Sequence, residues 1–133
     1  MRKTQRNSGH RGAAVIELAL VAPLFLILIL GIVEVGRALI VQQVLVNASR
    51  EGARSALREL ATIDSVKDRV VECLESSSLP INRDDIVVTP DPTEAVNGST
   101  MSVTVSVSYQ DVTWLPRTQY LDGRLEATTV MRF

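Results

Sequence analysis

An uncharged apolar run near the N-terminus constrains this chain more than any other feature. Residues 18–33 read LALVAPLFLILILGIV, and residues 13–17 extend the segment to 21 residues with one acid, Glu17. A helix of 21 residues is about 31 Å long, close to the roughly 30 Å thickness of the hydrocarbon core of a bilayer. The run therefore predicts a helix that crosses a membrane once.

The charges on either side of this run predict its orientation. Residues 1–12 hold four basic residues and no acid, whereas Arg37 and Arg50 are the basic residues that follow within about 17 residues. The positive-inside rule then places the N-terminus in the cytoplasm and the remainder outside. Residues 13–133 keep 10 basic and 15 acidic residues, a net charge of −5, which argues against a nucleic-acid partner.

Catalytic and metal-binding residue types are scarce. Cys73 is the only cysteine, so it cannot form an internal disulfide, and its place on an apolar helix face favours a structural role. His10 is the only histidine and belongs to the basic N-terminal segment, where it cannot serve a folded triad. We expect no enzyme, no metal site and no cofactor.

A cleaved secretory signal peptide is the first alternative to a membrane anchor. The apolar run exceeds the usual 7–15 residues of a signal peptide, and no A-x-A-like cleavage site follows it. A retained anchor is therefore favoured.

Glu17 is not explained by a plain anchor. An acid at the centre of a membrane helix costs about 2.5–3.5 kcal/mol, and less near an end. Cleavage after Gly12 would create an α-amino group on Ala13, one helical turn from the acid. A buried acid paired with a buried amine is tolerated where a lone acid is not, and the pair fixes the register of packing.

A basic leader that ends in Gly12, an apolar helix that begins at Ala13, and a glutamate at the fifth position after the cut resemble a type IV prepilin processing site. The resemblance implies that an inner-membrane aspartic peptidase cuts after Gly12 on the cytoplasmic side. Ala13 would become the new N-terminus, and Glu17 would meet the N-terminal amine of a neighbouring subunit during assembly.

Residues 11–57 are similar to the TadE-like pseudopilins of the tight adherence system, with matching residues at Pro23, Gly31, Glu34, Gly36, Ala48, Arg50, Glu51, Gly52, Ala53 and Arg54. The resemblance implies a minor structural subunit of a bacterial type IV pilus, because the major pilins are shorter and carry an aromatic residue where this chain has Leu18. It implies a place in the cytoplasmic (inner) membrane and a role in pilus assembly or secretion. The implied partners are a prepilin peptidase, other pilins or pseudopilins, inner-membrane pilus assembly proteins and membrane lipid. The alternative is an unprocessed single-pass anchor that displays a small extracytoplasmic binding or adhesion domain.

The chain then divides into a basic leader (1–12), a transmembrane helix (13–36), an extracytoplasmic continuation of that helix (37–61) and a head domain (62–133). No proline interrupts residues 38–61, which predicts one continuous rod. Ala48, Gly52 and Ala56 recur every four residues and form a small-residue stripe that lets another backbone approach closely. A second stripe of Arg50, Arg54 and Arg58 is either a solvated charged face or a docking surface.

The head has an α+β pattern. Thr62 and Asp64 can cap a helix whose apolar face comprises Ile63, Val66, Val70, Cys73 and Leu74. Alternation over residues 101–109 is a strong strand signal, residues 125–133 alternate similarly, and residues 86–89 predict a shorter, weaker strand. We expect one amphipathic helix and a small antiparallel sheet of about three strands.

Two loops connect the strands, residues 90–99 and 111–123. The second carries Trp114, Leu115, Tyr120 and Leu121, which are expected to close one end of the sheet, with a partner-binding patch as the alternative. Asp84 and Asp85 are expected to be turn residues without a catalytic role.

Overall fold

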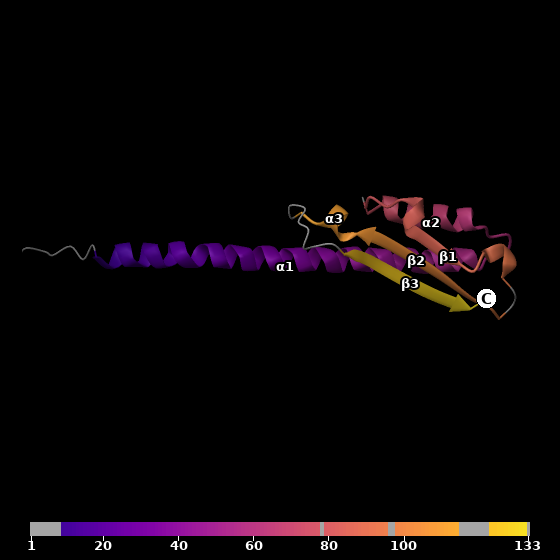
Figure 1. Ribbon diagram of the computed structural model, residues 1–133, viewed down its shortest axis with the longest axis horizontal. Coiled ribbons are helices and arrows are strands. Elements are labelled where there is room, and N and C mark those ends of the chain that lie inside the picture. The colour runs from indigo at the N-terminus through magenta and orange to yellow at the C-terminus, as the bar shows by residue number, and fades with distance from the viewer. Residues whose placement is uncertain (1–8, 78, 96–97, 115–122, 133) are drawn as a thin grey trace, which may run out of the picture. The chain divides into compact units, whose positions relative to one another are not determined.

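The computed structural model describes residues 9–77, 79–95, 98–114 and 123–132 (Figure 1). The chain divides into two compact units, residues 1–35 and residues 36–133. Helix α1 (Gly9–Ala56) begins in the first unit and continues into the second. From here on we call the whole second unit, residues 36–133, the head; it includes the predicted head domain of residues 62–133 and the part of α1 that follows Val35.

The head combines helices with a three-stranded antiparallel sheet, which confirms the predicted α+β class. Beyond α1 it contains α2 (Ile63–Glu75), β1 (Ile86–Thr89), β2 (Thr100–Ser108), the short α3 (Tyr109–Val112) and β3 (Arg124–Arg132). Two single-turn 3₁₀ helices, η1 (Arg83–Asp85) and η2 (Pro92–Glu94), flank β1. The strand order is β1-β2-β3, so the strand with the clearest alternation lies at the centre.

The alternation of β2 separates two faces of the sheet. Its apolar residues are 0–1 % exposed and point to one face, namely Met101, Val103, Val105 and Val107. The serine and threonine residues between them point to the other face, because successive side chains of a strand alternate. In the register of the sheet, Val103 lies opposite Val88 of β1 and Thr129 of β3.

Helices α1 and α2 cover the apolar face of the sheet. Leu45 of α1 and Val66, Val70 and Leu74 of α2 are buried in the same core as the apolar residues of β2. At the edge of this layer, the hydroxyl groups of Ser49 and Thr129 are hydrogen-bonded at 2.7 Å, and Gln42 Nε2 donates to the carbonyl of Glu126 at 2.8 Å. The residues of α1 that follow Gly36 are therefore an integral part of the head.

The predicted rod to residue 61 is wrong in its last turn, because α1 ends at Ala56. The chain then turns through residues 57–60, and Leu60 adopts a left-handed conformation with φ 63°. Thr62 caps α2 as predicted: its Oγ1 accepts from the backbone N–H of Ser65 at 3.2 Å, while Ser65 Oγ accepts from the N–H of Thr62 at 2.9 Å. This reversal lets α2 fold back onto the sheet.

The pKa of Asp91 predicts a pH dependence of head stability. Its Oδ1 accepts from the backbone N–H of Thr93 at 2.9 Å and from the Thr93 hydroxyl at 2.8 Å, and these bonds lower the pKa of Asp91 below its usual value. A lowered folded-state pKa contributes stability above the unfolded-state pKa, and this contribution is lost as the pH falls through the folded-state value. Urea unfolding of the full chain in detergent should show that Asp91→Asn reduces stability at neutral pH and that the difference from wild type shrinks on acidification. A difference that stays constant with pH would contradict this assignment.

Candidate functional site

The predicted processing site lies in an exposed part of α1. Gly12 and Ala13 are both exposed, and a Cβ added to Gly12 would meet no atom within 4 Å. Glycine in a helix interior costs about 0.5–1 kcal/mol relative to alanine. The fold of the described residues therefore gives no reason for glycine at position 12.

Glu17 lies one turn beyond Ala13 on the same side of α1, because residues four apart share a helix face. The side chain of Glu17 is exposed, and its neighbours Ile16 and Leu18 are each 66 % exposed. The carboxylate is thus one polar group on an otherwise apolar surface. Such a surface suits lipid or other helices, and there the acid requires a polar partner.

The apolar stretch of α1 is long enough to cross a membrane, and none of its most apolar window is buried within the chain. The core helix of a soluble domain would instead hide such side chains. Leu20, Leu24 and Ile27 are between 67 and 75 % exposed. The helix fits a single-pass membrane protein.

The small-residue stripe lies within the head. Ala48 and Ala56 are 0 % exposed and Gly52 is buried. A Cβ on Gly52 would lie 2.5 Å from Cγ2 of Val70 and 3.1 Å from Cγ1 of Val103. The stripe therefore allows close packing of α1 on α2 and β2 of the same chain.

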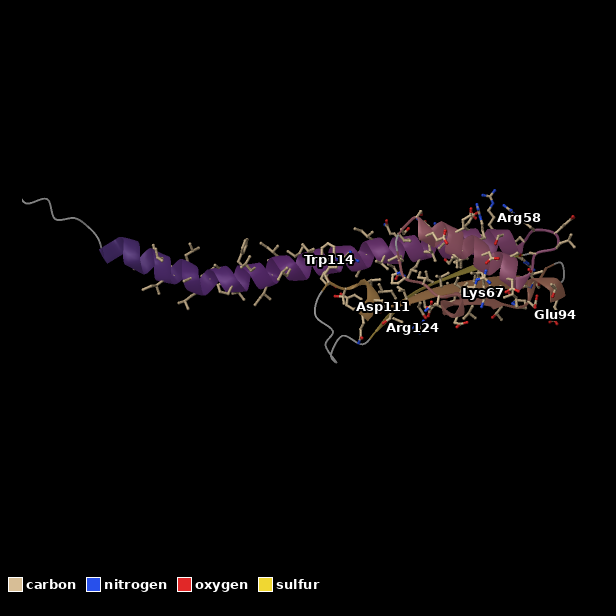
Figure 2. The ribbon with its side chains drawn as sticks, turned by 90° about the horizontal axis from the view of Figure 1, so that it is seen from above. Arg58, Lys67, Glu94, Asp111, Trp114 and Arg124 are labelled. Atoms are coloured by element: carbon tan, nitrogen blue, oxygen red, sulfur yellow. The ribbon has the colours of Figure 1, made fainter. Side chains whose placement is uncertain are left out.

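The second stripe remains on the surface. Arg50, Arg54 and Arg58 are all exposed, and Figure 2 shows Arg58 directed away from the ribbon. Glu51, between them, instead accepts from Arg69 of α2 at 3.0 Å. Arg69 also binds Glu72 at 2.8 Å, and these two acids, Glu72 first, raise the pKa of the guanidinium.

Arg37 and Trp114 form a contact that the sequence interpretation missed. Arg37 Nε donates to the carbonyl of Val112 at the end of α3, and its Cζ lies 4.6 Å from the centroid of the Trp114 ring. Trp114 is labelled in Figure 2. Trp114 remains 72 % exposed, so the prediction that it closes one end of the sheet is wrong. Leu115, Tyr120 and Leu121 lie outside the described residues.

Asp85 has a structural role near the start of β1. The Asp85 carboxylate forms an ion pair with Arg124 of β3 and accepts a hydrogen bond from the backbone N–H of Asn82 at 3.3 Å. Arg124 also donates to the hydroxyl of Ser106 at 2.8 Å. Within the described ranges, no group of three or more histidine, cysteine, aspartate or glutamate residues is placed to hold a metal ion.

Comparison with known proteins points to the segment of α1 that contains Gly12, Ala13 and Glu17. The sequence model of the family described as TadE-like protein matches residues 12–54. No curated protein and no solved structure matches the chain. The match begins at Gly12 and contains Ala13, Glu17 and the helix that enters the head. Over residues 12–54 the chain is similar to TadE-like proteins, which confirms the resemblance for this segment.

Proposed function

We propose that the chain is a minor, pseudopilin-like structural subunit that takes part in assembly of a tight adherence pilus. The observation that carries the proposal is the TadE-like match over residues 12–54, which begins at the proposed cleavage site and includes the apolar helix. In this proposal the chain has no enzymatic activity. A prepilin peptidase acts on it, and it then associates with other pilins or pseudopilins and with inner-membrane assembly proteins.

Cleavage after Gly12 would place the new amine of Ala13 at the start of the membrane helix. Ala13, which would carry the amine, and Glu17 are one turn apart along α1, and both residues are exposed. When two such helices pack with a small axial offset, the amine of one can meet the carboxylate of the other. This pairing compensates both charges in a medium of low polarity and selects one register.

Processing can be tested directly by the mass of the chain extracted from membranes of cells that contain the peptidase. We expect the mature chain to begin at Ala13, with the N-terminus in the cytoplasm. Gly12→Val should block this cleavage. It should leave the chain inserted, because a Cβ added at position 12 would meet no atom within 4 Å. Gly31→Val is the matched control on the same helix, because the space around Gly31 is equally open.

A wild-type chain that still begins at Met1 under these conditions would contradict the processing proposal. The chain would then be an unprocessed anchor that displays its head domain for binding or adhesion. Processing of Gly12→Val at the wild-type level would contradict the assignment of Gly12.

A further inference from the structure

We propose that Arg37 and Trp114 contact the lipid headgroup layer and attach the head to the membrane that α1 crosses. This inference goes beyond the proposed function and rests on it only for membrane insertion. It requires neither processing nor assembly into a pilus.

The position of Arg37 along α1 sets its depth. Residues 13–33 account for about 31 Å of helix, which fills the hydrocarbon core. Arg37 comes four residues later, about 6 Å further along the helix axis. The headgroup layer is about 5–8 Å thick on each side of the bilayer, so the guanidinium lies where lipid phosphates are. Guanidinium groups bind phosphate with paired hydrogen bonds.

The contacts of Arg37 bring Trp114 to the same depth. The ring centroid of Trp114 is 4.6 Å from Cζ of Arg37. Arg37 Nε also donates a hydrogen bond to the carbonyl of Val112, two residues before Trp114. Trp114 and Arg37 both belong to the head, so their contact does not depend on how the two units are arranged.

Trp114 is 72 % exposed, whereas tryptophan side chains are highly buried on average. Indole is amphipathic and is enriched at membrane interfaces, where its ring meets acyl chains and its N–H meets polar groups. Leu39 and Ile40, on the same turn of α1 as Arg37, are 62 % and 66 % exposed and extend the apolar surface at this depth. A lipid interface matches both the indole and these side chains.

A protein partner is not needed to cover this site. Any group that touches Arg37 lies beside the bilayer surface, because Arg37 follows the membrane-spanning run directly in the sequence. The head would then be attached at two points, the covalent link through α1 and the contact of Trp114 with lipid.

Trp114 is the only tryptophan of the chain, so intrinsic fluorescence reports this site alone. The full chain would be reconstituted in phospholipid vesicles whose acyl chains carry bromine either next to the headgroup or near the terminal methyl. We expect strong loss of emission with bromine next to the headgroup and a smaller loss with the deeper bromine. Flotation with the vesicles would establish insertion in every sample.

The matched control moves the tryptophan within the head. Val130 is 60 % exposed on the open face of β3, and its neighbour Thr129 binds Ser49, which lies 12 residues beyond Arg37 on α1, or about 18 Å. The variant Trp114→Phe/Val130→Trp should therefore insert equally but lose little emission with either lipid. If the inserted wild-type chain loses no more tryptophan emission than this control, the inference is overturned and the proposed function is left standing. A chain that fails to float with the vesicles would overturn both.

Discussion

Glu17→Leu is expected to abolish association of the chain with its pilin partners while cleavage and membrane insertion persist. Leucine removes a carboxylate that costs up to about 2.5–3.5 kcal/mol in a membrane helix, so insertion should improve. Association should fail because the amine of the neighbouring subunit loses its partner. Breaking a buried ion pair on one side costs about 3–5 kcal/mol, which corresponds to a loss of about a hundredfold or more in association.

The measurement is co-purification of the tagged chain with other pilus subunits from solubilised membranes, together with the number of pili on the cell surface. Ile16→Leu is a suitable control, because it changes an exposed neighbour of Glu17 without altering charge. Glu17→Asp keeps the charge on a shorter side chain and should retain part of the association. Unchanged co-purification and piliation of Glu17→Leu would show that the pairing does not occur. A variant that is no longer cleaved would place Glu17 in recognition by the peptidase instead.

The parts of the fold that could be predicted from sequence are those where one local pattern decides. The alternation in β2 continues without interruption from Thr100 to Ser108 and can bury only one face of a strand. The apolar spacing in α2 and the hydroxyl of Thr62 before it define that helix and its start. The apolar length of α1 similarly leaves a membrane-spanning helix as the simplest outcome.

The end of α1 could not be predicted because no glycine or proline marks it. The chain leaves the helix after Ala56, and Leu60 accepts a left-handed conformation that ordinarily favours glycine. The return of α2 onto the core outweighs this local preference, and such a tertiary effect is not visible in residues 57–61 alone.

The candidate site residues likewise divide into those related by local sequence spacing and those that only the tertiary fold brings together. The pattern of Gly12, Ala13 and Glu17 is local in sequence and was found from the resemblance, whereas their processing and pairing remain predictions. The contact of Arg37 with the end of α3 joins residues 75 apart, and no spacing rule relates them. The stripe at Ala48, Gly52 and Ala56 indicated close packing, but sequence spacing alone did not identify α2 and β2 as the groups that this chain packs there.

Gly52→Ala is expected to destabilise the head, although alanine favours helices. The added Cβ would lie 2.5 Å from Cγ2 of Val70, 3.1 Å from Cγ1 of Val103 and 3.8 Å from Cγ1 of Val66, so a movement of α1 away from α2 would be limited by β2. Valine side chains are restricted about χ1 and cannot readily rotate away. Overpacking a core in this way typically costs about 1–3 kcal/mol, which is a large part of the stability of a small domain.

The matched control for this prediction is Gly36→Ala, on the same helix, where the new Cβ would meet no atom within 4 Å. Alanine should stabilise the helix there by about 0.5–1 kcal/mol, so the difference between the two variants isolates the packing effect. Urea unfolding of the full chain in detergent gives both values. Adding Val70→Ala to Gly52→Ala should recover stability relative to the sum of the single changes, because it removes the methyl group that the new Cβ meets. If Gly52→Ala is as stable as Gly36→Ala, the close packing of α1 on α2 and β2 is not what requires glycine at position 52.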